Sequence, residues 1–286
     1  MIPAEFDYIR ANSLDEALSL LAQNEDAKIL AGGHSLIPAM KLRLAQPPML
    51  VDIGRIKDLS YVREASGQIQ IGAMTTHYQI ESSDLLKRIC PLLPECASHI
   101  GDVQVRNKGT IGGSLAHSDP AGDWPAAIIA LSADLVIAGK NGERTVKADE
   151  FFIDLLTTAL EPNEILREIR IAKSNGRTGQ AYVKMHHPAS GFAVVGVAAN
   201  LVMNGDECQS ASVGVTGVSS KAYRATAVEN GLKGTRPSDE TIAAASAHAT
   251  DGKDINGDLF ASGDFRRHLA EIYTRRAIAT ALGRAG

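Results

Sequence analysis

The sequence contains little cysteine, few aromatic residues and no strong excess of either charge. Its 286 residues include only three cysteines, Cys90, Cys96 and Cys208, which are too few and too scattered for a disulfide framework or an iron–sulfur cluster. Cys90 and Cys96 stand beside apolar residues, so we expect both thiols to be buried. The formal net charge is −4 and no long basic run is present, which argues against a nucleic-acid partner.

Long hydrophobic runs are also missing. No apolar stretch approaches the ~20 residues needed to cross a bilayer, which predicts a chain without a transmembrane segment. The first residues lack the basic region and apolar core of a signal peptide, so we expect a cytoplasmic protein. Hydrophobic residues make up 44% and charged residues 22%, a balance typical of globular proteins. The length suits one large domain or two moderate ones.

Several familiar site motifs are incomplete. Neither glycine pair of the chain has the Gly-x-Gly-x-x-Gly spacing of a dinucleotide fold, and the Gly-Lys-Ser/Thr ending of a phosphate loop is missing. The run Gly33–Ile37 resembles a serine hydrolase elbow, but Ile37 stands where that turn needs glycine. The adjacent His186 and His187 would point in different directions, so we interpret them as loop histidines and predict no metal site.

Two glycine motifs are the most informative feature that is present. Glycine lets backbone N–H groups approach a ligand closely, and successive N–H groups form an anion-binding concavity. Either motif alone is more often an ordinary turn. Together they predict one ligand with two phosphates, held from both sides with help from nearby hydroxyls. The first motif is Ala31, Gly32, Gly33, His34 and Ser35, and the second is Thr110, Ile111, Gly112, Gly113 and Ser114.

Up to residue 172 the pattern predicts alternating strands and helices. Ser13 and Glu16 form a capping box that starts a helix at Leu14. Ser35 and Asp123 are expected to cap the helices that follow them. The expected helices cover residues 36–44, 80–88, 92–101 and 124–133. The expected strands cover residues 27–30, 50–53, 68–73, 134–138 and 164–172, whereas 101–107 and 115–122 are expected to be loops.

The polar, glycine-rich run 174–179 is the best candidate for a domain boundary. Strands are expected at 182–184, 192–202 and 211–218, with a hairpin turn at 204–206. Helices are expected at 225–232, 239–249 and 265–282. Three strands followed by three helices predict an α+β domain, so we divide the chain into domains 1–176 and 177–286.

Three further residues have both an ordinary and a ligand-binding interpretation. Lys184 is by default a solvated lysine at a sheet edge, but in a flavoprotein it would hold positive charge near the reduced ring. Phe192 is by default a core residue, or else it covers a ring face. Asp123 is by default a helix cap, and it could also accept hydrogen bonds from ribose or ribityl hydroxyls.

Three motifs in this order carry a family resemblance. The run Ala31–Pro38, the run Thr110–Ser114 and the run His187–Gly196 resemble the FAD-binding medium subunits of molybdenum hydroxylases, especially the type found in aerobic carbon monoxide dehydrogenase. The resemblance covers essentially the whole chain. It implies a two-lobed α/β FAD domain of the vanillyl-alcohol-oxidase (PCMH) type. A C-terminal domain with a three-stranded antiparallel sheet and helices is expected to follow.

The resemblance also implies roles for the residues singled out above. Both glycine motifs would cradle the FAD pyrophosphate, Asp123 would bond the ribityl chain, and Lys184 and Phe192 would lie close to the flavin. Relatives often have Asn in place of Ser114 and Tyr in place of Phe192, which leaves FAD binding expected but the redox tuning open. No residue of this chain is expected to act as a nucleophile, acid or metal ligand.

The implied function is electron transfer within a larger complex. Substrate would be oxidised at a molybdenum cofactor in a large subunit, and electrons would pass through two [2Fe–2S] clusters of a small subunit to FAD here, and on to an external acceptor. A dimer of three-subunit units is implied. A self-sufficient flavin oxidoreductase and a flavin-free assembly scaffold remain alternatives. The substrate (carbon monoxide, an aldehyde or an N-heterocycle) and the acceptor stay open.

Overall fold

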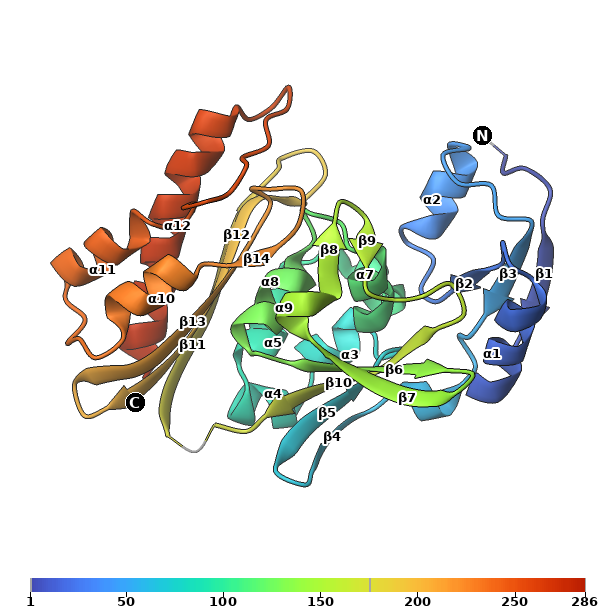
Figure 1. Cartoon of the computed structure of the whole chain (residues 1–286), viewed down its shortest axis with the longest axis horizontal. Helices are drawn as coiled ribbons and strands as arrows, with labels where there is room; N and C mark the ends of the chain where they lie inside the picture. Colours follow the sequence, from blue (N-terminus) through green and yellow to red (C-terminus); the bar gives the residue numbers. More distant parts are fainter. Residues whose placement is uncertain (1, 175, 286) are drawn as a thin grey trace.

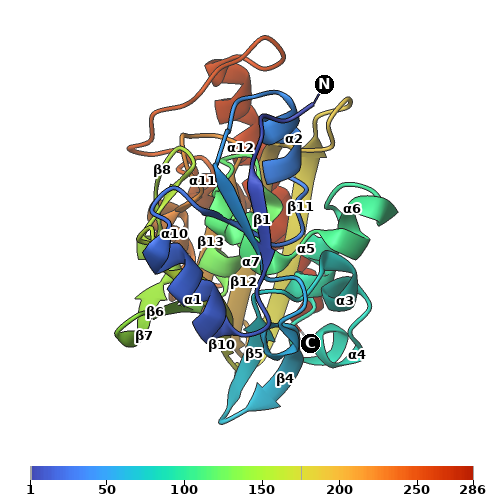
Figure 2. The same cartoon turned by 90° about the vertical axis from the view of Figure 1, so that its right-hand side faces the viewer.

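The computed structural model describes residues 2–174 and 176–285. The molecule is elongated, with an N-terminal lobe at one end, a five-stranded sheet with its helices in the middle, and a four-stranded sheet with its helices at the other end (Figure 1). In the view turned by 90° the N-terminal lobe stands in front, with α3, α4 and α6 on one side and β6 and β7 on the other (Figure 2). No helix in the described part of the chain is long and apolar enough to cross a membrane.

The N-terminal lobe is a small parallel sheet with two helices. Its strands are β1 (Asp7–Arg10), β3 (Met49–Asp52) and β2 (Lys28–Leu30), in that order, and its helices are α1 (Leu14–Gln23) and α2 (Leu36–Lys41). The Ser13 side chain accepts a hydrogen bond from the Glu16 N–H, as predicted, but the Glu16 carboxylate bonds the N–H of Asn12 rather than that of Ser13.

The central sheet is antiparallel throughout. Its order is β4 (Val62–Ala65), β5 (Gln68–Gly72), β10 (Ile165–Ala172), β6 (Asp134–Gly139) and β7 (Gly142–Lys147). The segment between β5 and β6 supplies α3 (His77–Glu81), α4 (Asp84–Ile89), α5 (Leu92–Ser98), α6 (Val103–Lys108), α7 (Ile111–His117) and α8 (Asp123–Ala130). After β7, the short α9 (Ala148–Phe151) leads to a two-stranded ribbon of β8 (Phe152–Asp154) and β9 (Thr157–Thr158).

The C-terminal sheet has four antiparallel strands. Their order is β11 (Arg177–His186), β12 (Ala193–Asn204), β13 (Glu207–Thr216) and β14 (Tyr223–Arg224). The prediction of three strands was wrong because β14 pairs through only two residues, too few to show a period of two. The predicted turn 204–206 closes the hairpin of β12 and β13, and Gly205 has a φ of +57°.

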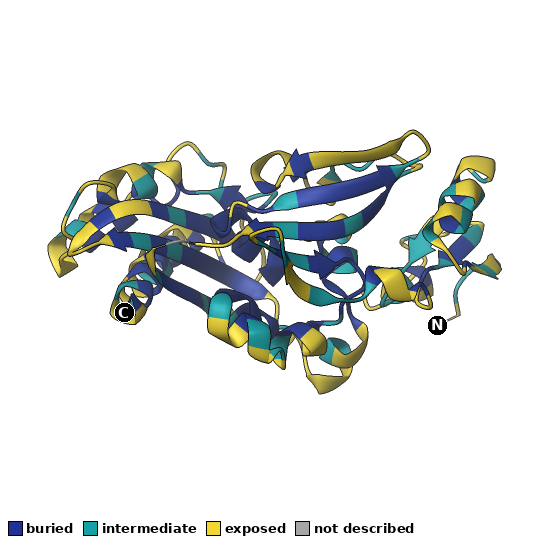
Figure 3. Ribbon diagram, turned by 90° about the horizontal axis from the view of Figure 1, so that it is seen from below, coloured by how far each residue is buried: buried dark blue, intermediate teal, exposed yellow. Residues whose placement is uncertain are grey.

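Both faces of the C-terminal sheet are covered. Along β12, Ala198 belongs to the central core with α8, whereas Val197 and Ala199 belong to the core formed with α10 (Thr226–Leu232), α11 (Asp239–Ser246) and α12 (Gly263–Arg284). Alternate side chains therefore face opposite layers. Figure 3 shows the sheets as largely buried and the outer helices as exposed on their solvent side. Every residue of α8 is buried, because this helix lies between the two sheets.

Several expected boundaries were wrong. β11 begins at Arg177, inside the predicted linker 174–179, of which Asn175 lies outside the described residues. The expected loops at 101–107 and 115–122 contain α6 and the end of α7. α2 and α8 each end three residues early, at Lys41 and Ala130. The short strands β1, β4 and β7 were missed because they carry few apolar residues and are largely exposed. The predicted burial of Cys90 and Cys96 is confirmed.

Candidate functional site

A cleft of about 770 Å³ lies between the N-terminal lobe and the rest of the molecule. It is lined by the loop after β2, the start of α7, the β8–β9 ribbon and the loop between β11 and β12. Ile111 is buried in the core beside it. The predicted site residues that line this one cleft are Ala31, Gly32, Gly33, His34, Ser35, Thr110, Gly112, Gly113, Ser114, Asp123 and Phe192.

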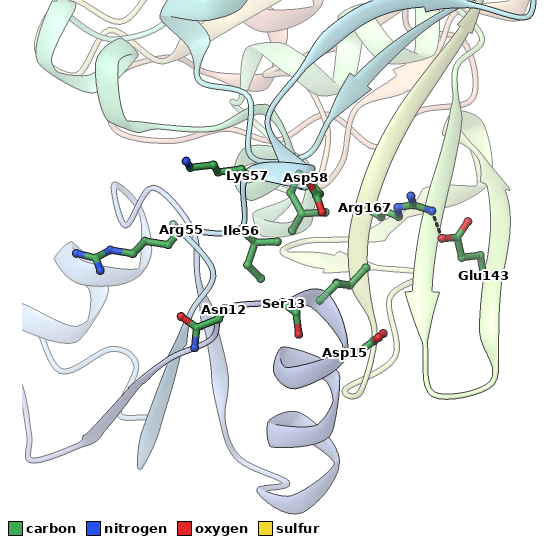
Figure 4. A pocket seen from close by; sticks show the side chains of 11 residues that line it. Asn12, Ser13, Asp15, Arg55, Ile56, Lys57, Asp58, Glu143 and Arg167 are labelled. Atoms are coloured by element: carbon green, nitrogen blue, oxygen red, sulfur yellow. Dashed lines mark hydrogen bonds and ion pairs between the residues drawn. The ribbon is translucent and has the colours of Figure 1, made fainter.

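A second cavity, of about 500 Å³, lies between α1 and the strands β7 and β10 (Figure 4). Its wall carries both signs of charge. Arg167 is paired with Glu143, and Arg55 and Lys57 point away from the other labelled side chains. The charges are thus partly neutralised or directed outward, so we build the site on the larger cleft.

The first glycine motif presents free backbone donors. Among the described residues, 2–174 and 176–285, no atom accepts a hydrogen bond from the backbone N–H groups of residues 32–36. Gly33 has a φ of +77°, a conformation that L side chains rarely adopt. Ser35 precedes α2 but makes no side-chain capping bond, so the expected cap is wrong. The consequence is a run of successive amides at the wall of the cleft, which is an anion-binding arrangement.

The second motif differs, because its amides are already paired within the protein. It forms the first turn of α7 rather than a loop, with Thr110 as N-cap accepting from the Gly113 N–H at 3.1 Å. Three further N–H groups donate to backbone carbonyl oxygens. The Ile111 N–H donates to Thr75 at 3.0 Å, the Gly112 N–H to Ala73 at 2.8 Å, and the Ser114 N–H to Thr110 at 3.0 Å. The expectation of free amides on both sides is therefore wrong for this motif, which offers hydroxyl groups instead.

The two motifs touch each other. A Cβ added to Gly113 would lie 3.3 Å from the Ala31 Cβ. A Cβ added to Gly32 would collide with the Lys108 carbonyl oxygen and the Gly109 Cα, and one added to Gly112 would collide with Ala73. Glycine at positions 32 and 112 is thus required for the close approach of two chain segments, in addition to any role toward a ligand.

His77 lies between the motifs and was missed from the sequence. It is only 4% exposed, lines the cleft, and donates its backbone N–H to the Gly109 carbonyl at 3.0 Å. Its Nδ1 accepts from Trp124 Nε1 at 3.0 Å. Burial, together with His34 and Arg106, lowers the pKa of His77 to about 4. The sequence signal near His77 was the capping box of Thr76 and Gln79, which places His77 at the start of helix α3.

Asp123 and Lys184 form a buried ion pair. Asp123 is the first residue of α8 and makes no capping bond, so the expected cap is wrong. Its Oδ1 accepts from Tyr182 Oη at 2.5 Å and lies 2.8 Å from Lys184 Nζ. The Lys184 side chain is fully buried and also donates to the His99 carbonyl, so it is not a solvated edge lysine. Burial raises the pKa of Asp123, against the lowering effect of Lys184 and Tyr182.

The loop between β11 and β12 reaches the cleft through Phe192, which is 46% exposed and so is not a core residue. The neighbouring histidines diverge as predicted. His186 Nε2 lies 3.3 Å from His99 Nδ1, whereas the His187 ring packs on Phe260 with ring centres 4.4 Å apart. Within the described chain, no group of three or more His, Cys, Asp or Glu side chains is placed to hold a metal ion.

The chain matches two protein-family models. Residues 4–174 match the FAD binding domain in molybdopterin dehydrogenase, and residues 180–281 match the CO dehydrogenase flavoprotein C-terminal domain. Together the two matches cover the cleft and both sheets that flank α8.

Full-length relatives agree with these models. The carbon monoxide dehydrogenase medium chain of Hydrogenophaga pseudoflava is 40% identical over 285 residues, 99% of each chain. The glyceraldehyde dehydrogenase medium chain of Sulfolobus acidocaldarius is 35% identical over 277 residues, 97% of this chain and 98% of the relative. A structure of carbon monoxide dehydrogenase from H. pseudoflava, lacking the Mo-pyranopterin moiety of its cofactor, has a chain that superposes with a TM-score of 0.97 at 41% identity, covering 100% of both chains.

Proposed function

Because this chain belongs to the family of FAD-binding medium subunits of molybdenum hydroxylases, we propose that the cleft between the two glycine motifs is its FAD site. The chain is an FAD-containing oxidoreductase subunit of the carbon monoxide dehydrogenase type, and its role is electron transfer. When bound, FAD supplies the redox chemistry, and the protein supplies binding, orientation and local charge.

The observation that carries the assignment of the site is the run of unpaired amides at residues 32–36. These N–H groups suit the pyrophosphate of FAD, because an anion needs several converging donors. Thr110 and Ser114, which both carry a hydroxyl group, line the same cleft. Its volume of about 770 Å³ lies within the range of about 300–1,000 Å³ usual for cofactor pockets, so the residues present fit the cofactor.

Other residues of the cleft are proposed to contact the ribityl chain and the flavin ring. Both Tyr182 and Lys184 engage Oδ1 of Asp123, which leaves Oδ2 to accept from a ribityl hydroxyl. Lys184 acts through Asp123 rather than on the flavin directly, which revises the role expected from the family resemblance. Phe192, at the mouth of the cleft, covers a face of the flavin ring.

The partners and finer architecture follow from the family. We propose a large subunit with the molybdenum cofactor, a small subunit with [2Fe–2S] clusters that delivers electrons, and an external acceptor. The vanillyl-alcohol-oxidase (PCMH) type of the first domain is supported by its two sheets, and a boundary at 176/177 by family matches that end at 174 and resume at 180. The dimer of heterotrimers rests on the resemblance alone, and the cytoplasmic location stays a prediction.

A pair of glycine variants tests the FAD site. Gly33 and Gly67 have nearly the same φ, +77° and +73°, but only Gly33 lines the cleft. We expect Gly33→Val to lose bound flavin, because its Cβ would lie 3.1 Å from Ile37 and 3.3 Å from Leu30 and so shift the loop that presents the amides. Gly67→Val should keep the flavin, because it carries a similar positive φ but has no atom within 4 Å of the added Cβ. Flavin absorbance of each purified, folded chain measures this. Full flavin content in Gly33→Val would contradict the site.

A further inference from the structure

We propose that His77 is an FAD-positioning residue whose Nε2–H donates a hydrogen bond to the pyrophosphate held between the two glycine motifs. The inference rests on the proposed FAD site and adds to it a residue outside both motifs. Three features of the structure support it: the fixed tautomer of the ring, the place where Nε2 lies, and the scarcity of cations in the cleft.

Trp124 fixes the tautomer of the His77 ring. The indole N–H can only donate, so Nδ1 of His77 must accept the 3.0 Å hydrogen bond between them. The proton of the neutral ring is therefore on Nε2. The ring is also held in place, because Trp124 is fully buried in α8 and the His77 backbone N–H bonds Gly109. His77 thus presents a single donor in a defined direction.

Nε2 lies at the junction of the two motifs. A Cβ added to Gly109 would fall 2.7 Å from Nε2, and Gly109 is also the residue against which Gly32 packs. His77 and Gly109 both line the cleft. Nε2 has no hydrogen-bond acceptor among the residues that the structure describes, although the side chain is almost wholly buried. Nε2 itself is not sealed from the cleft, so a ligand oxygen there can accept its hydrogen bond.

The cleft depends on neutral donors to hold an anion. Lys28 is the one lysine or arginine among the described residues that line it. The other donors that line it are the amides of the first motif, hydroxyl groups, and the rings of His34, His77 and His117. Burial keeps the His77 ring neutral around pH 7, so it binds the pyrophosphate as a dipole. The loss of a donor whose ring is fixed by Trp124 is expected to weaken binding measurably.

Two variants of the full chain test the proposal. His77→Phe removes the donor, and His77→Gln keeps an amide N–H that reaches about as far as Nε2. We expect His77→Phe to raise the Kd for FAD by about 10- to 100-fold and His77→Gln to stay within about threefold of the wild type. Riboflavin, which lacks the phosphates, should bind wild type and His77→Phe equally. An unchanged FAD Kd, or an equal loss of riboflavin affinity, would overturn the proposal.

A spectroscopic measurement on the unmutated chain covers the case in which His77→Phe does not fold. Long-range ¹H–¹⁵N correlation spectra of the histidine rings should show Nε2 of His77 protonated and Nδ1 not, and Nε2 should shift on addition of FAD. A proton on Nδ1, or an Nε2 signal unmoved by FAD, would contradict the proposal. If the wild-type chain binds no FAD at all, the proposed function fails instead, so the two failures are distinguishable.

Discussion

At the scale of single residues, Asp123 and Lys184 stabilise the fold only as a pair. Both are buried, and removing one partner leaves an uncompensated charge. We expect Lys184→Met to lower the free energy of unfolding by about 3–5 kcal/mol, and the double variant Lys184→Met with Asp123→Leu to recover much of it. Urea denaturation of the full chain measures both.

The matched control is Lys147, whose ion pair with Asp134 leaves the lysine side chain 65% exposed. Lys147→Met should cost no more than about 1 kcal/mol, because exposed pairs are screened by water. If Lys184→Met and Lys147→Met cost the same, the burial of the Asp123–Lys184 pair is not what stabilises the fold.

His77 makes the stability of the FAD-free chain sensitive to acid. Its pKa is about 4 in the folded chain and about 6.5 when unfolded, so between these values the unfolded chain binds more protons. Stability should therefore fall as the pH drops from about 6.5 to 4, by up to about 3 kcal/mol from this residue. In His77→Gln the stability should fall less over the same pH range, because the contribution of His77 is missing. Equal slopes for wild type and variant, from denaturation at several pH values, would contradict the assigned pKa.

The identities of the cleft residues were more predictable than their hydrogen bonds. The glycines, hydroxyls and Asp123 were found because their side-chain chemistry is visible in the sequence. Two features were not predicted, namely the hydrogen bond of the Gly112 amide to Ala73 and the burial of Lys184. Both depend on contacts between segments that are distant in the sequence. His77 was missed because its partner Trp124 lies 47 residues away.

At the scale of elements, α8 joins the two halves of the molecule, and its contact with β13 depends on Gly214. A Cβ at Gly214 would collide with the Ala126 carbonyl of α8. We therefore expect Gly214→Ala to lower the free energy of unfolding by about 1–3 kcal/mol through overpacking. Gly283→Ala, in open space on α12, should instead be neutral or stabilising by up to about 1 kcal/mol. Equal effects of the two substitutions on thermal unfolding would contradict this account of the α8–β13 contact.

Elements with strong apolar periodicity or clear caps were predicted within a few residues, as in α1, β6 and β10. Short or exposed strands were not, because β1 and β7 have little burial to impose a pattern. α7 was read as part of a turn because its two glycines are typical of turns. In the structure they permit the close packing of the α7 start against the segment after β5.

At the scale of the whole molecule, the cleft is assembled from parts that lie far apart in the sequence. The N-terminal lobe supplies unpaired amides, the central region supplies hydroxyls, His77 and Asp123, and the C-terminal sheet supplies Phe192. No one of these parts forms a site alone. Binding of FAD should therefore hold the N-terminal lobe, the central sheet and the β11–β12 loop together.

A crystal structure of the full chain with bound FAD tests this account most directly. We predict pyrophosphate oxygens within hydrogen-bond distance of the N–H groups of residues 32–36, with the ribityl chain beside Asp123 and the flavin ring at Phe192. A cofactor bound elsewhere, or one whose pyrophosphate faces away from those amides, would contradict the central claim.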